Sequence, residues 1–182
     1  MSEGYVPERR TRPGAGRWLL ATTALLLALA ACSTPAGSSR DSRSIVVTHP
    51  MLGAVVRELM LDQASVTVLI PNGQDLHEWE PSARDIETLM RAGLIVENGL
   101  GLEAGMGKVL QQARAQGIKF FTASDHITVR RVGAGEGIPT DDPDQAIGAE
   151  DPHLWLDPVA MKAVVAALAT QVKADLGLDV TE

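Results

Sequence analysis

The sequence is poor in cysteine, in aromatic side chains and in positive charge. It contains one cysteine, two phenylalanines and one tyrosine, and its formal net charge is −7 at pH 7. A single cysteine excludes an internal disulfide, so the stability of the fold must come from a largely aliphatic core. The excess of acidic side chains argues against nucleic acid as a partner, whereas it is compatible with cations.

The chain also lacks an apolar run long enough to cross a membrane as a helix. The uncharged segment 18–31 has 14 residues, and a membrane-spanning helix needs about 20. Arginines precede this segment and small residues end it, which predicts a signal peptide over residues 1–31. Cys32 follows directly and resembles the lipidated cysteine of bacterial lipoproteins, although an ordinary secretory signal with an incidental cysteine is the alternative. We expect a lipid anchor on Cys32, a flexible tether over residues 32–44 and an extracytoplasmic, membrane-anchored location in the periplasm or at the cell surface.

Strand and helix patterns alternate along the rest of the chain. Short β-branched runs predict strands, and segments with apolar residues at helical spacing follow them. Strands that alternate with helices form parallel sheets, so the sequence predicts an α/β fold with a four-stranded parallel sheet and flanking helices. The expected strands are 44–48, 65–70, 94–96 and 118–121, and the expected helices are 50–61, one from 82, one from about 103 to 116, and one from 158.

An acidic segment, 133–150, interrupts this alternation. It contains four glycines, two prolines and five acidic residues, and it shows no apolar periodicity. We interpret it as a flexible surface loop in which the acidic side chains are solvated. A role in attracting metal ions or passing them on is the less favoured alternative, and its carboxylates would be Glu136, Asp141, Asp142 and Asp144.

One short phrase occurs twice in the chain. Residues 75–81 and 151–158 each place Asp, His and Trp at alternate positions and close with Pro. The two histidines, His77 and His153, are 76 residues apart. Imidazole is the commonest protein ligand for zinc and similar metals, so two histidines on separate loops can meet in one metal site.

The neighbours of these histidines have expected supporting roles. Alternate residues of an extended segment share one side, so Trp79 and Trp155 could shield the imidazoles from water. Asp75 or Asp151 could orient a ring nitrogen from behind the ligand. A histidine that only bonds its loop and a tryptophan that only covers the core are the simpler alternatives.

Two histidines do not complete a zinc site, because zinc typically takes four ligands. His49 ends the first expected strand at the same edge of the sheet and is a less favoured ligand. His126, near the fourth strand, ranks lower. Glu78 and Asp157 are carboxylates beside the phrases, but Asp157 followed by Pro is better explained as a helix cap.

Three stretches in order resemble the zinc and manganese solute-binding lipoproteins of bacterial ABC importers, the cluster A-I family. They are residues 74–82, 95–103 and 151–158. The resemblance implies two lobes joined by one long helix, with the metal held between them by four side chains. His77 and His153 match the first two ligand positions, one in the first lobe and one in the hinge region.

The resemblance covers the first lobe only. It implies that residues 45–156 form the N-terminal metal-binding lobe and that residues 157–182 begin the interlobe helix. A second lobe has no counterpart in the sequence, so we expect a truncated chain that holds half of the site. Leu76 stands where the family usually has Pro, which leaves the neighbouring ligand in place.

The expected function is capture of Zn(II), or alternatively Mn(II), for delivery to the membrane subunits of an ABC permease, without catalysis. Zinc is favoured because two imidazoles suit it, whereas manganese prefers oxygen ligands. A zinc-dependent hydrolase is the main alternative, but the phrases lack the helical His-x-x-x-His spacing of common metalloproteases. A surface adhesin, a role attributed to some family members, is a further alternative.

Overall fold

A computed structural model describes residue 1, residues 40–136 and residues 143–180. Residues 2–39 lie outside the described residues, and with them Cys32 and nearly all of the predicted signal peptide and tether. The centre of the acidic segment, 137–142, also lies outside them. Residues 38–182 form one compact unit that contains every helix and strand described below. No helix in the described ranges is long and apolar enough to cross a membrane.

Four parallel strands form one sheet in the order β2-β1-β3-β4. This confirms the predicted four-stranded parallel sheet. The first strand begins earlier than predicted, because Asp41 pairs with Ala92 and draws residues 41–43 of the expected tether into the sheet. Backbone pairing with a neighbour holds these polar residues in a strand that their side chains do not predict. The strands are β1 (Asp41–Val47), β2 (Ser65–Val68), β3 (Ala92–Glu97) and β4 (Lys119–Thr122).

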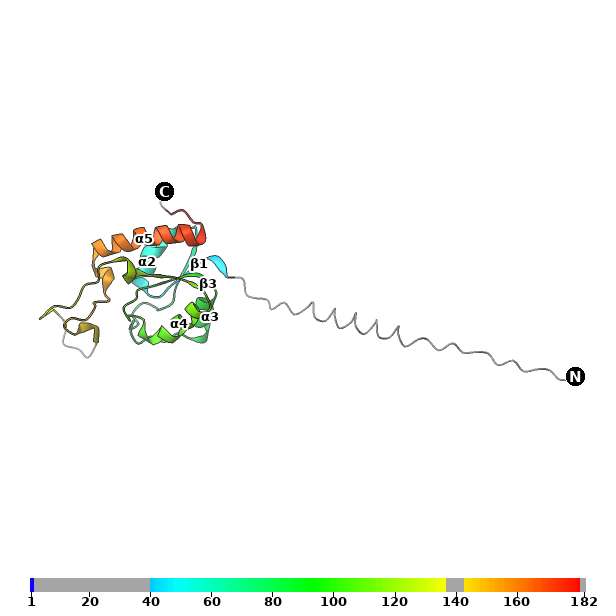
Figure 1. Ribbon diagram of the computed structural model, residues 1–182, viewed down its shortest axis with the longest axis horizontal. Coiled ribbons are helices and arrows are strands. Elements are labelled where there is room, and N and C mark those ends of the chain that lie inside the picture. Colours follow the sequence, from blue (N-terminus) through cyan, green and yellow to red (C-terminus); the bar gives the residue numbers. More distant parts are fainter. Residues whose placement is uncertain (2–39, 137–142, 181–182) are drawn as a thin grey trace. The chain divides into compact units, whose positions relative to one another are not determined.

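Helices cover both faces of the sheet (Figure 1). Alternation along the strands explains the two layers, because Ile45 and Val47 point into one apolar core and Val46 points into the other. The first core contains side chains of α2 and α5, and the second contains side chains of α3 and α4. The helices are α2 (Pro50–Met60), α3 (Ala83–Met90), α4 (Gly107–Ala115) and α5 (Pro158–Leu176).

The predicted helix starts are confirmed where a capping side chain is present. Ser82 and Asp85 form a reciprocal capping box at α3. The Asp157 carboxylate accepts the N–H groups of Val159 and Ala160 at the start of α5. The helix expected from about residue 103 begins instead with the 3-10 turn η1 (Ala104–Met106), and α4 starts at Gly107.

The carboxyl ends of β1 and β3 lie side by side at the centre of the sheet. The topological switch point of the sheet lies between β1 and β3, because the chain continues from β1 to β2 on one side and from β3 to β4 on the other. Ligands of open α/β sheets bind in the crevice beyond such a point. His49 follows β1, and the loop with His77 follows β2, so both begin at this edge.

Candidate metal centre

The first histidine loop is a tight turn held by Asp75. Its carboxylate accepts the backbone N–H of His77 at 2.8 Å and that of Glu78 at 3.3 Å. Leu76 and Trp79 pack against the core cluster under α3 and α4. These contacts fix the turn from below, so the His77 side chain remains 28% exposed at the edge of the sheet. Leu76 is partly buried there and helps to anchor the loop.

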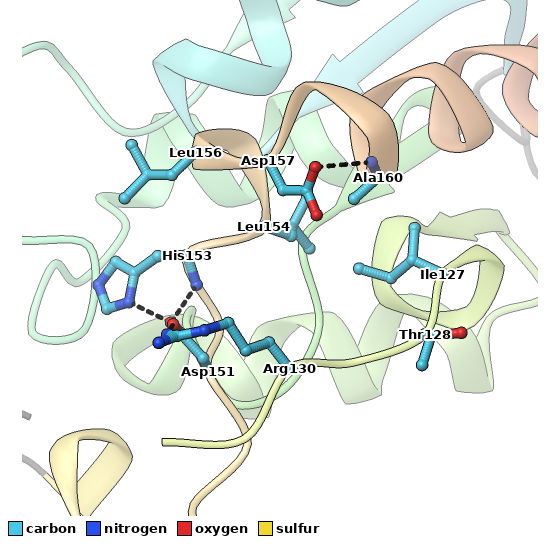
Figure 2. A pocket seen from close by; sticks show the side chains of 9 residues that line it. All are labelled: Ile127, Thr128, Arg130, Asp151, His153, Leu154, Leu156, Asp157 and Ala160. Atoms are coloured by element: carbon cyan, nitrogen blue, oxygen red, sulfur yellow. Dashed lines mark hydrogen bonds and ion pairs between the residues drawn. The ribbon is translucent and has the colours of Figure 1, made fainter. Parts of the chain in front are cut away.

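The second histidine is held by its own aspartate and by a 3-10 turn, η4 (Leu154–Leu156). The Asp151 carboxylate accepts from the His153 backbone N–H at 3.0 Å and from its ring Nδ1 at 2.8 Å (Figure 2). Leu154 is buried in the first core, which fixes the turn after the histidine. With Nδ1 engaged, Nε2 is the ring nitrogen that His153 can offer to a metal.

Arg130 also contacts the Asp151 carboxylate (Figure 2). Its guanidinium donates to Asp151 Oδ2 at 2.7 Å and to Glu136 Oε2 at 2.7 Å. Partial burial alone would raise the pKa of the Asp151 carboxyl, but hydrogen bonds from His153 and Arg130 outweigh burial and lower that pKa. Asp151 therefore stays ionised beside the imidazole, as a carboxylate that orients a metal ligand must.

The structure brings His77 and His153 together with a third side chain, Asp144. The two imidazole centroids are 6.4 Å apart. Asp144 Oδ2 lies 3.5 Å from His77 Nε2, and the ligand atoms of all three residues lie within 4.8 Å of one another. Nitrogen and carboxylate donors at this spacing can converge on one divalent ion.

The expected supporting residues take unequal roles. Asp151 bonds to a ring nitrogen of His153, and Trp155 lies edge-on to the same ring, with ring centroids 5.3 Å apart. The first phrase differs: Asp75 accepts from backbone N–H groups, and Trp79 is partly buried against the core cluster. The cause is the backbone, because both phrases form turns in place of the extended segment that the alternation implied.

His49 is buried and is not one of the three residues whose ligand atoms converge. It precedes α2, and its ring lies 5.1 Å from that of Trp155. Neither ring nitrogen makes a hydrogen bond within the described part of the chain, although the Asn98 side chain faces the ring. Burial lowers the pKa of His49 to about 4, which Asn98 partly opposes. His49 is therefore a neutral packing residue beneath Trp155.

The other candidates from the sequence also lie outside the cluster. His126 is exposed and stacks on Phe121, with ring centroids 4.5 Å apart. Asp157 caps α5, as the sequence indicates. Glu78 is exposed, and its backbone N–H bonds to Asp75.

A buried turn after β3 connects both histidine loops, and the sequence did not identify its residues as part of the site. The Asn98 side-chain amide donates to Pro152 O at 2.9 Å, directly before His153. The Gly105 N–H donates to His77 O at 2.9 Å. A Cβ on Gly105 would collide with the backbone carbonyl of Trp79, so the loop approaches this close only because residue 105 is glycine.

Glu103 closes the same turn from inside the protein. Its Oε1 accepts from the Asn98 N–H at 2.7 Å and from the Thr48 hydroxyl at 2.7 Å. Burial raises the pKa of the Glu103 carboxyl despite these donors. The only signal for this turn in the sequence was the Asn-Gly pair followed by Glu within residues 95–103.

Comparison with known proteins gives a consistent picture. Residues 45–175 match the family described as zinc-uptake complex component A, periplasmic (ZnuA). The manganese ABC transporter substrate-binding lipoprotein PsaA of Streptococcus pneumoniae is 35% identical over 141 residues, which are 74% of this chain and 43% of that protein. The iron ABC transporter substrate-binding lipoprotein MtsA of Streptococcus pyogenes is 32% identical over 139 residues, covering 73% and 41%.

A solved structure extends the likeness to three dimensions. The periplasmic zinc-binding protein TroA of Treponema pallidum superposes with a TM-score of 0.60 at 27% identity, over 72% of this chain and 44% of TroA. The chain spans less than half the length of the curated relatives that it matches.

Proposed function

Because the chain belongs to the family of periplasmic zinc-uptake component A proteins, we propose that it captures a divalent transition metal outside the cytoplasm and delivers it to the permease of an ABC importer. The observation that carries this proposal is the meeting of His77 and His153. Two turns that are 76 residues apart present their imidazoles with ring centroids 6.4 Å apart at the carboxyl edge of the sheet.

We propose zinc as the preferred cargo, with manganese as the alternative. Two imidazoles favour zinc, whereas manganese is better served by oxygen donors. The names of the relatives reported above include zinc, manganese and iron proteins, so the fold alone does not specify the metal. PsaA and MtsA are named substrate-binding lipoproteins of ABC transporters, which favours capture over hydrolysis.

Membrane attachment completes the proposal. A signal peptide over residues 1–31 would export the chain, and a lipid on Cys32 would hold it at the membrane beside the permease. PsaA and MtsA are named lipoproteins, which supports this arrangement. Residues 45–156 would form the metal-binding lobe, and the helix after residue 157 would lead away from it.

Isothermal titration of the full chain in detergent with zinc chloride tests the metal site. We expect saturable binding of one zinc ion and its loss in the double variant His77→Ala, His153→Ala. The matched control is His126→Ala, which removes an exposed imidazole outside the cluster and should bind like the unchanged protein. Undiminished affinity in the double variant would contradict the proposed site.

A further inference from the structure

We infer that Asp144 is a third metal ligand, supplied by the acidic segment between β4 and α5. This inference rests on the proposed function, because it concerns the same ion as His77 and His153. Asp144 Oδ2 lies 3.5 Å from His77 Nε2, and all three ligand atoms lie within 4.8 Å of one another. Donor atoms around a tetrahedral zinc ion are about 3.3 Å apart, so the Asp144–His77 pair is already near ligand spacing. The two pairs that include His153 lie within 4.8 Å, so each has at most about 1.5 Å to close.

The environment of Asp144 indicates that its carboxylate faces a cation. Its side chain is only 13% exposed, although it belongs to a segment with the composition of a solvated loop. Oδ1 accepts a long hydrogen bond of 3.4 Å from Gln145, while Oδ2 is buried and makes no hydrogen bond within the described ranges. Buried carboxylate oxygens without donors are costly, and a metal ion shared with His77 would satisfy this one.

Backbone pairing between the two ends of the acidic segment closes its base. Across the base of the segment, the Val132 N–H donates to Ala149 O at 2.9 Å and the Gly148 N–H donates to Val132 O at 2.8 Å. Arg131 forms a β-bridge and a 2.6 Å ion pair with Glu150. Asp144 then lies in the 3-10 turn η3 (Pro143–Gln145), which Pro143 begins. The paired base and the 3-10 turn η3 therefore position the Asp144 carboxylate, which lies on the C-terminal side of the segment.

The same base positions His153. Arg130 bonds to Glu136, within the segment, and to Asp151, which accepts from the His153 ring. One arginine thus links the segment that carries Asp144 to the carboxylate that orients His153. Arg130 therefore ties the start of the segment, at Glu136, to the loop that carries His153.

A third ligand of this kind changes the chemistry expected of the lobe. Two imidazoles and one carboxylate form a three-ligand set that leaves a fourth position open to water or to another donor. The oxygen donor also makes manganese more acceptable than two imidazoles alone would. The described residues of this lobe would then supply three of the ligands of the bound ion.

Titration of the full chain with zinc chloride and with manganese chloride tests the inference. Asp144→Asn keeps the size of the side chain and removes its charge. We expect this variant to weaken zinc binding by roughly 100-fold, because loss of a ligand should cost at least as much as loss of a residue that supports a ligand. Asp62→Asn, an exposed aspartate in the turn after α2, is the matched control and should leave affinity unchanged. Zinc K-edge X-ray absorption should show one oxygen donor fewer from protein in Asp144→Asn.

The outcomes separate this inference from the proposed function. If Asp144→Asn binds both metals like the unchanged protein while the His77, His153 double variant does not, Asp144 only forms an ion pair with His77 and the inference is wrong. If the double variant retains full affinity, the proposed function fails as well. Asp144→Glu, which restores a carboxylate on a longer stem, should recover part of the lost affinity, and thermal unfolding without metal should show that each variant is folded.

Discussion

At the scale of single residues, similar phrases give their side chains different surroundings. Asp151 bonds to the ring of His153, whereas Asp75 bonds to the backbone at His77 and Glu78. Trp155 lies beside two histidine rings, whereas Trp79 packs into the core. The His153 ring is therefore oriented by an ionised carboxylate, and the position of the His77 ring depends on its turn and on Asp144.

His49 gives the residue scale a pH-dependent prediction. Burial lowers its pKa to about 4 from the usual 6.5, so the unfolded chain binds a proton more readily than the folded one. Above pH 6.5, His49 is neutral in both states and costs the folded protein nothing. As the pH falls from 6.5 toward 4, proton uptake by the unfolded chain lowers the free energy of unfolding by about 3 kcal/mol. We expect the variant His49→Phe, which cannot take up a proton, to lose less stability over this range than the unchanged protein.

Urea unfolding in the presence of EDTA at several pH values between 7 and 4 measures this difference. The control is His126→Phe, which replaces an exposed imidazole stacked on Phe121. Its stability should follow the pH dependence of the unchanged protein. Parallel curves for His49→Phe and the unchanged protein would show that His49 is not the buried group that titrates.

At the scale of elements, the turn from Asn98 to Gly105 connects two loops that the sequence separates. It bonds to the carbonyl before His153 through Asn98 and to the carbonyl of His77 through Gly105. Thr48 and Glu103 fix the turn to the end of β1. The distance between the two histidines therefore depends on this turn as well as on the loops themselves.

We expect Asn98→Ala to weaken zinc binding by about 10- to 100-fold, as the loss of a supporting residue does at other metal sites. The variant leaves the Pro152 carbonyl without its donor, so the loop before His153 loses its connection to β3. Titration with zinc gives the affinity, and Asn72→Ala, in an exposed turn, is the control. Thermal unfolding without metal should also show that the free energy of unfolding falls by about 1–3 kcal/mol. A loss of stability with unchanged zinc affinity would limit Asn98 to a structural role.

At the scale of the whole molecule, the candidate ligands connect three segments: the loop after β2, the acidic segment and the turn before α5. A ligand that binds only the folded state stabilises it, and at a concentration of 100 Kd the gain is about 2.7 kcal/mol. For a domain of this size we expect saturating zinc to raise the unfolding temperature by roughly 5–10 °C.

Differential scanning calorimetry of the full chain with zinc, and after addition of EDTA, measures the shift. EDTA should return the unfolding temperature to that of the metal-free protein. The double variant His77→Ala, His153→Ala should show no shift at the same zinc concentration. A shift of equal size in that variant would place the bound ion elsewhere in the chain.

Part of the site could be predicted from sequence because its signals were local. The repeated phrase singled out His77 and His153, and the strand pattern placed both at one edge of a parallel sheet. Asp144 could not be selected in the same way, since it stands among several acidic residues without periodicity. Asn98 and Gly105 were equally hidden, because their contacts are with chain far from them in sequence.

The sequence by itself determined the order of strands and helices, the parallel sheet and the two candidate histidines, because hydrophobic periodicity, helix caps and short motifs are properties of neighbouring residues. Only the tertiary structure decided which carboxylate faces the histidines, which aspartate orients a ring, and that His49 is buried without a ring hydrogen bond among the described residues. These outcomes depend on how loops from different strands pack together, and that packing brings together residues whose spacing along the chain carries no sign of their contact.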